Sequence, residues 1–143
     1  MTEIIELKEY RAEYIGPMQR LLDQLTSRPV QLTEALLREI IADRNTHQFL
    51  LLENGEVAGM LTVGFYSSPT GGKAWMEDVV VDNAHRGRGL SKLLVAHAIA
   101  FVKEQQVPLL MLTSNPKRIA ANQLYRRMGF ERKETNVYRM KTC

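Results

Sequence analysis

One stretch, residues 74–94, constrains this chain most, because it changes from a strand pattern to a helix pattern across two closely spaced glycines. The run Met76–Val81 contains three consecutive valines, which favour an extended and buried backbone. Asp82 and Asn83 then favour a turn, because their side chains compete for local backbone hydrogen bonds. From Leu90 onward, apolar residues recur at helical spacing. The stretch therefore predicts a buried strand, a glycine-bearing loop and an amphipathic helix, in that order.

A loop of this kind can bind an anion. The first turn of a helix leaves its backbone N–H groups without partners, and the helix dipole places partial positive charge there. Gly87 and Gly89 allow a phosphate to approach the backbone closely. Arg86 and Arg88 add fixed positive charge beside them. We therefore favour phosphate binding over the alternative, a surface turn whose arginines face water.

At this loop the sequence resembles the GNAT superfamily of acyl-CoA-dependent N-acyltransferases. Their signature Gln/Arg-x-x-Gly-x-Gly/Ala is present at 86–91, with Ser91 in place of the usual Gly or Ala. A second signature, Ala-x-x-Leu-Tyr followed by Gly-Phe, is present at 121–130. The resemblance implies acetyl-CoA as co-substrate, and it assigns the following residues to cofactor binding: Val79, Val80, Val81, Arg86, Gly87, Arg88, Gly89, Leu90, Ser91 and Lys92. Arg118 is added to these candidates because of its charge, although the family usually has another residue there.

The same resemblance implies a catalytic base. The run Glu-Asp-Val-Val-Val that begins at Glu77 is similar to one in glucosamine-6-phosphate N-acetyltransferases, so the cofactor half resembles that group. Glu77 is the proposed base, and the alternative is a solvated charge at the end of a strand. Strand alternation predicts that Asp78 and Asp82 lie on the face opposite Glu77, where they would be structural. Many relatives carry a base at the position of Thr113, and threonine cannot serve as one.

Tyr125, in the second signature, is the proposed general acid, because in the family this tyrosine points at the thioester sulfur. The alternative is a helix tyrosine that only packs on the sheet. Seven residues earlier, many relatives have an asparagine that contacts the cofactor, and this chain has Arg118. Arg118 is therefore expected either to reach a phosphate or simply to face water.

The hydropathy pattern along the chain predicts a mixed α/β fold. The resemblance implies the GNAT arrangement, a central and mostly antiparallel sheet with a splayed parallel strand pair, flanked by about four helices. Asn54-Gly55 between two apolar runs predicts a hairpin, and residues 67–73 are expected to form a loop. The expected strands are 2–8, 48–53, 56–66, 76–81, 109–113 and 136–141, and the expected helices are 11–25, 33–43, 88–105 and 117–128.

Length and composition bear on the number of domains, on metal binding and on membrane association. With 143 residues, residues 1–143 are expected to form a single N-acetyltransferase domain. Three histidines and the one cysteine, Cys143, show no metal-ligand spacing, so no metal is expected. The start of the chain lacks the pattern of a signal peptide, and no apolar run approaches the length that spans a bilayer. We therefore expect a cytoplasmic protein without a membrane partner.

The sequence hypothesis is an acetyl-CoA-dependent N-acetyltransferase that acts on a primary amine of a small molecule or a protein. The alternative is an inactive module of the same fold that senses acyl-CoA. The presence of both Glu77 and Tyr125 favours the enzyme. Nucleic acid is not expected as a partner, because the net charge is only +3 and no aromatic stacking platform is apparent. The sequence leaves a homodimer open.

Overall fold

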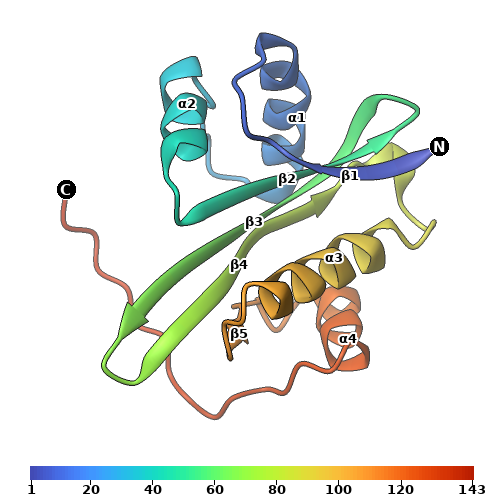
Figure 1. The fold of residues 1–143 in the computed structure, drawn as a ribbon. Helices are drawn as coiled ribbons and strands as arrows, with labels where there is room; N and C mark the ends of the chain where they lie inside the picture. Colours follow the sequence, from blue (N-terminus) through green and yellow to red (C-terminus); the bar gives the residue numbers. More distant parts are fainter. The chain divides into compact units, whose positions relative to one another are not determined.

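A five-stranded sheet in the order β1-β2-β3-β4-β5 organises the first part of the chain (Figure 1). The first four strands pair antiparallel, and β5 pairs parallel to β4. The computed structural model describes all residues from Met1 to Cys143 and divides into two compact units, Met1–Thr113 and Ser114–Cys143. The strands all lie in the first unit: β1 Thr2–Glu6, β2 Thr46–Glu53, β3 Glu56–Ser68, β4 Gly71–Val81 and β5 Leu110–Met111.

Three α-helices belong to the same unit: α1 Ile15–Leu25, α2 Glu34–Ala42 and α3 Leu90–Glu104. A 3-10 turn over Ala12–Tyr14 precedes α1, which begins late because Pro17 is tolerated only in a first helical turn. The hydroxyl of Thr33 accepts a hydrogen bond from the backbone N–H of Leu36 at 3.1 Å and caps α2, as predicted. A second 3-10 turn, Asn83–His85, lies between β4 and the glycine loop.

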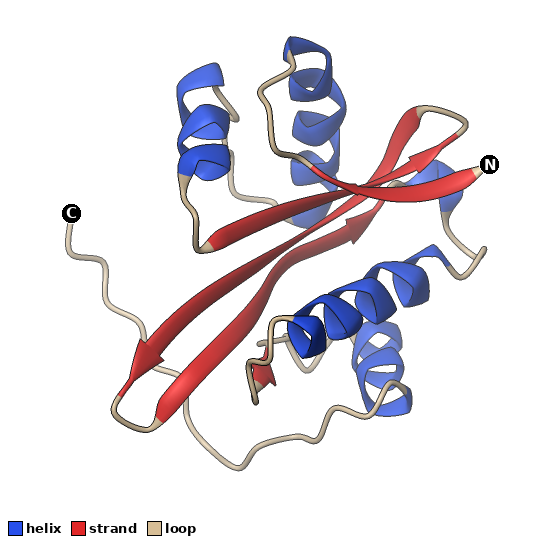
Figure 2. Ribbon diagram, viewed as in Figure 1, coloured by secondary structure: helices blue, strands red, loops and turns tan.

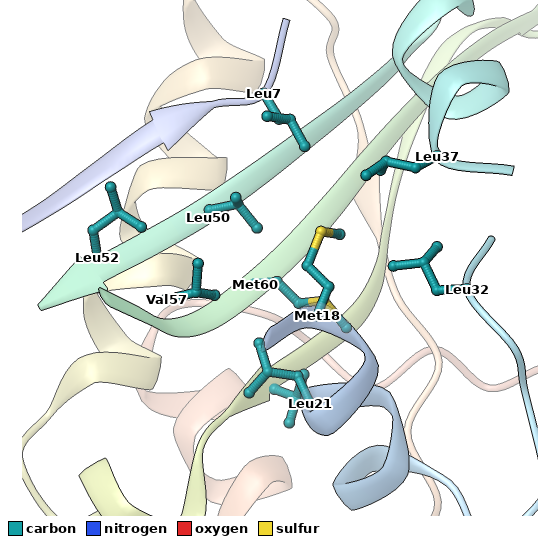
Figure 3. Packing of buried hydrophobic residues seen from close by; sticks show 10 residues of the cluster. Leu7, Met18, Leu21, Leu32, Leu37, Leu50, Leu52, Val57 and Met60 are labelled. Atoms are coloured by element: carbon teal, nitrogen blue, oxygen red, sulfur yellow. The ribbon is translucent and has the colours of Figure 1, made fainter. Parts of the chain in front are cut away.

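The helices cover both faces of the sheet (Figures 1 and 2). Helices α1 and α2 cover one face, where apolar side chains from both helices and from β2, β3 and β4 form a continuous core (Figure 3). Helix α3 covers the other face, where Phe49 of β2 contacts Phe101 and His97 of α3 edge-on. Gly59 permits this close approach, since a Cβ there would lie 3.1 Å from Leu94 Cδ1. The sheet is therefore the middle layer of a three-layer unit.

The hairpin of β3 and β4 is longer than the sequence predicts. Both strands continue to a connection of only two residues, Pro69 and Thr70, so the predicted loop over 67–73 is wrong. Residues Ser67 and Ser68 pair with Gly72 and Gly71 across the hairpin. Cross-strand hydrogen bonding therefore overrides the local glycine signal. The predicted Asn54-Gly55 hairpin is confirmed, with positive φ at both residues.

The second unit contains one helix, α4, over Ile119–Arg127. The predicted final strand at 136–141 is wrong, because residues 130–143 form neither helix nor strand. A strand requires a partner for its N–H and C=O groups, and backbone hydrogen bonds to residues 131–143 are absent. The apolar side chains of this segment are correspondingly exposed, and Tyr138 is 87% accessible. The alternating pattern in the sequence thus indicated a strand that finds no partner within this chain.

Candidate active site

A β-bulge interrupts β4 just after Glu77. Thr62 of β3 pairs with Glu77 and Met60 pairs with Val80, so two residues of β4 lie opposite one residue of β3. Asp78, the first of the two, has a φ of 51°, in the left-handed region that aspartate tolerates better than most residues. The bulge therefore lies directly beside the proposed base and changes the direction of every side chain that follows.

The bulge overturns one prediction. Strict alternation placed Asp82 on the face opposite Glu77, but the extra residue moves Asp82 to the same face. Glu77 shares its face with Val80, which packs in the core beneath α1. The carboxylate of Asp82 likewise contacts Arg20 and Gln24 of α1. Both acidic side chains thus lie on the side of the sheet that α1 and α2 cover.

Beyond Trp75, one edge of β4 has no strand partner. Pairing with β5 is limited to Ala74 with Leu110 and Trp75 with Met111, which gives the parallel pair its splayed form. The N–H of Asp82 donates to Ala58 in β3 at 2.8 Å, so alternation turns the N–H groups of Val79 and Val81 toward the open edge. These two groups are available to an extended ligand or to a developing negative charge.

The glycine loop presents a run of free donors. No protein group accepts a hydrogen bond from the backbone N–H groups of the six consecutive residues 87–92. Helix α3 begins after Gly89, which has a φ of 74° and supplies no side-chain cap. A Cβ built at Gly87 or Gly89 would meet no atom within 4 Å, so the space in front of the loop is open. Six unpaired donors at a helix start, with room before them, fit a phosphate group.

The residues of this loop contribute in different ways. Leu90 is buried, so only its N–H is available, whereas Lys92 is exposed and Ser91 partly exposed. The side chain of Arg86 turns back, and its Nε donates to the backbone oxygen of Val81 at 3.3 Å. Arg88 is bound to a carboxylate elsewhere in the unit, as described below. The structure therefore places the predicted loop residues together, with the backbone rather than the arginines as the principal donor.

Asp82 fixes the entrance to the loop. Its Oδ1 accepts hydrogen bonds from the N–H of Ala84 at 3.1 Å and from Gln24 Nε2 at 3.3 Å. Its Oδ2 accepts from Arg20 Nε at 3.4 Å. Gln24 Oε1 in turn accepts from the N–H of Asn83 at 2.8 Å. The Ala84 hydrogen bond, followed by those from Gln24 and Arg20, holds the pKa of Asp82 below its ordinary value. Asp82 is thus structural, as predicted.

A second tie holds the middle of the loop. Arg88 donates to the buried carboxylate of Glu53, at the end of β2, at 3.1 Å. The hydroxyl of Thr2 also donates to Glu53, and together these contacts lower the pKa of that carboxyl group. No sequence pattern indicates this pair, because the partners are far apart in the chain and only the folded sheet brings them together. Arg88 therefore has a structural contact besides its predicted role in phosphate binding.

Glu77 itself is accessible and makes no hydrogen bond that would lock its carboxylate. Partial burial raises its pKa, and the adjacent negative charge of Asp78 raises it further. A carboxyl group with a raised pKa is a stronger base than an ordinary glutamate once it is ionised. Position and electrostatics both suit Glu77 to accept a proton.

Tyr125 and Arg118 lie in the second unit, on and before α4. The ring of Tyr125 packs edge-on against Phe130 with 5.9 Å between centroids. Burial raises the pKa of the Tyr125 phenol, while the charge of Arg118 opposes part of that rise. A raised pKa keeps the phenol protonated at neutral pH. The backbone oxygen of Arg118 accepts hydrogen bonds from Asn122, so this residue helps to start the helix.

Two further findings concern other kinds of site. The structure contains no group of three or more His, Cys, Asp or Glu side chains positioned to hold a metal ion. None of its helices is both long enough and apolar enough to cross a membrane.

Comparison with known proteins places these features in a family. A model described as the acetyltransferase (GNAT) family matches residues 9–130, which confirms the predicted resemblance. The chain is 34% identical over 77 residues to streptothricin acetyltransferase of Streptomyces lavendulae, a match that covers 54% of this chain and 40% of the relative. The chain spans less than half the length of the curated relatives it matches.

Solved structures confirm the fold. A protein from Bacillus halodurans C-125, titled a transcriptional regulator, superimposes with a TM-score of 0.86 at 25% identity, covering 99% of this chain and 100% of that one. Glucosamine-6-phosphate N-acetyltransferase from Arabidopsis thaliana gives a TM-score of 0.81 at 22% identity, covering 98% of each chain. At that identity the second likeness concerns the fold alone. The mixed sheet with its parallel pair and four helices agrees with the predicted arrangement.

Proposed function

The chain belongs to the acetyltransferase (GNAT) family, and on that premise we propose that it transfers an acetyl group from acetyl-CoA to a primary amine. The acceptor is an amine of a small molecule or a protein. Glu77 is the proposed base and Tyr125 the proposed acid of a direct transfer.

One observation carries the proposal most strongly. The free donors of residues 87–92 follow β4 after one short 3-10 turn, and β4 has an open edge and an accessible carboxylate. Acetyl-CoA has an anionic pyrophosphate at one end, amide groups along its arm and a thioester at the other. The loop provides N–H groups for phosphate, and the edge at Val79 and Val81 provides N–H groups for amides or an oxyanion. Glu77 lies farther along the same strand, so the order of donors along the chain fits the order of groups in the co-substrate.

The chemistry assigned to these residues balances. Glu77 takes a proton from the acceptor's ammonium group, directly or through one water, because only a neutral amine can attack a carbonyl. The neutral amine nitrogen bonds to the carbonyl carbon and gives up a second proton to solvent, and the carbon–sulfur bond breaks to leave the amide. The free edge of β4 donates hydrogen bonds to the oxygen that becomes negatively charged. Tyr125 gives its proton to the leaving thiolate, and solvent restores the protonation of both residues.

Replacing Glu77 with glutamine tests the proposed base. Glutamine keeps the shape of the side chain but removes its basicity, so kcat/KM should fall by about 10² to 10⁴ at neutral pH. Part of the loss should return at higher pH, where the free amine is abundant. The measurement is a pH–rate profile with an amine panel and detection of free coenzyme A. A mutant profile that superimposes on the wild-type profile would show that Glu77 is only a charge on the strand.

Asp78→Asn is the matched variant for this test. Asparagine tolerates the left-handed backbone at this position, so the bulge should persist. Because the charge of Asp78 raises the pKa of Glu77, its removal should move the acidic limb of the kcat/KM profile to lower pH. The plateau rate should change little. An acidic limb that stays in place in Asp78→Asn would mean that Glu77 does not titrate in that limb.

A further inference from the structure

The two faces of the β3–β4 hairpin differ in how well they are covered. On the face toward α3, the side chains of Leu61, Val63, Ala74 and Met76 are all buried. On the other face, pairing places Thr62 beside Glu77, Gly64 beside Trp75 and Tyr66 beside Lys73, and all six are at least partly exposed. The face that carries Glu77 is therefore open at this end of the sheet, beyond the core that α1 and α2 cover.

Gly64 leaves an empty space in the middle of that open face. A Cβ at this position would meet no atom within 4 Å. Its neighbours across the sheet are Trp75 of β4 on one side and Thr46 of β2 on the other. Two strand spacings separate these neighbours, about 10 Å. We call the open area bounded by Gly64, Tyr66, Trp75 and Glu77 the Gly64 strip.

Aromatic rings form one wall of the strip. The indole Nε1 of Trp75 donates to the hydroxyl of Tyr66 at 3.4 Å, which holds the two side chains beside each other. Tyr66 is 49% exposed. The ammonium of Lys73 lies 5.6 Å from the centre of the Tyr66 ring and donates to Ser68 and Thr70. It also donates to the backbone oxygen of Gly71, so its three donors are occupied. The wall therefore consists of the partly exposed ring of Trp75 and the more exposed ring of Tyr66, held together by their hydrogen bond.

A carboxylate lies at the end of the strip. Glu77 is two residues from Trp75 on the same face of β4, a separation of about 7 Å along the strand. A partly exposed indole favours the flat face of a ring, and a carboxylate favours an ammonium group. A ligand that satisfies both must carry its amine within a short bond path of a ring.

We propose that the Gly64 strip binds the acceptor and that the acceptor is a cyclic amine, with its ring against Trp75 and its amino group toward Glu77. This inference rests on the proposed function for the fate of the amine, because acetylation would follow there. The proposed position of the ring and the amino group does not depend on that function, because it is argued only from the residues of the strip. Residues Trp75 and Gly64 then determine which amines are accepted, and Glu77 determines whether they react.

The test uses the fluorescence of Trp75, which is the only tryptophan in the chain. Three amines of equal carbon number serve as probes: cyclohexylmethylamine, benzylamine and heptylamine. Both cyclic probes should change the fluorescence at concentrations about tenfold lower than heptylamine, as expected for one well-placed ring contact. Comparison of the two cyclic probes distinguishes a saturated ring from an aromatic one. Equal midpoints for all three amines would overturn the proposal.

Filling the space supplies the second arm. Gly64→Val adds a side chain that suits a strand and projects into the empty space, so it should weaken binding of the cyclic probes about tenfold or more and leave acetyl-CoA affinity unchanged. Gly64→Ser serves the same purpose if the valine variant folds poorly, with circular dichroism as the check. Unaltered binding of cyclic probes in a folded variant would exclude the strip as the site.

Failure of this inference can be distinguished from failure of the proposed function. Cyclic amines that bind to the strip without being acetylated would contradict the enzyme and leave the strip as a binding site. Acetylation of straight-chain and cyclic amines with equal kcat/KM, together with equal fluorescence midpoints, would support the enzyme and reject the strip.

Discussion

Tyr125 illustrates how a single residue can be tested without disturbing its unit. Its ring packs against Phe130, and its hydroxyl donates to no group within residues 114–143. Burial raises the pKa of the phenol, so its proton is retained at neutral pH. The ring is thus a packing element and the hydroxyl a candidate donor, and a substitution can separate the two roles.

Tyr125→Phe retains the ring and deletes only the hydroxyl. We expect kcat to fall by about 10² or more while acetyl-CoA affinity is nearly unchanged, because the lost interaction belongs to the leaving group. Steady-state kinetics together with calorimetric titration of acetyl-CoA measure the two effects separately. Should turnover persist at the wild-type rate while chemistry limits kcat, the proton must come from another source.

Local sequence patterns predict the structural role of some residues but not the face of the sheet on which they lie. The capping role of Asp82 could be predicted, because aspartate after a strand favours local backbone hydrogen bonds. Its face could not, because the bulge at Asp78 depends on how β3 and β4 pair. The same limit applies to the open space at Gly64, which exists only because four strands align there.

At the scale of elements, the segment from β4 through the glycine loop to α3 agrees best with what the sequence predicts. The predicted order of strand, loop and helix is confirmed, because a run of valines, two glycines and an amphipathic stripe are local signals. The long β3–β4 hairpin was missed, because its glycines and proline suggested a loop while cross-strand pairing maintained the strands. Tertiary pairing thus extends elements that local propensity would end.

Gly89→Asp tests the glycine loop as an element. The new side chain brings negative charge to the helix start and imposes a positive φ on a residue with a Cβ. Acetyl-CoA affinity should fall about tenfold or more, measured by calorimetric titration. Gly55→Asp is the matched control, since Gly55 also has a positive φ and open space but lies in the β2–β3 turn. An equal loss in both variants would indicate general strain rather than a phosphate site.

At the scale of the whole molecule, long-range polar contacts hold the sheet, α1 and the glycine loop together. Asp82 connects the end of β4 with Arg20 and Gln24 of α1. Glu53 connects β2 with Arg88 of the loop and with Thr2 of β1. Both carboxylates are buried and ionised, and their contacts lower the pKa of each below its ordinary value. Sequence patterns cannot reveal such ties, because their partners are distant in the chain.

These ties predict how stability depends on pH. A carboxyl group whose pKa is lower in the folded state stabilises the fold above its unfolded pKa, and this contribution is lost as pH falls through the folded pKa. The stabilisation from Asp82 should therefore begin to fall as the pH approaches 3.8, the ordinary pKa of aspartate, and should be lost at lower pH.

Asp82→Asn should cost about 1 to 2 kcal/mol of unfolding free energy at pH 7, as expected for hydrogen bonds to a charged group. The difference between wild type and variant should shrink as the pH is lowered below 3.8. Urea unfolding at a series of pH values measures both effects, and Glu9→Gln, at an exposed carboxylate without a hydrogen-bond partner, serves as the control. A difference that is constant across this pH range would show that the ionised form of Asp82 contributes nothing to stability.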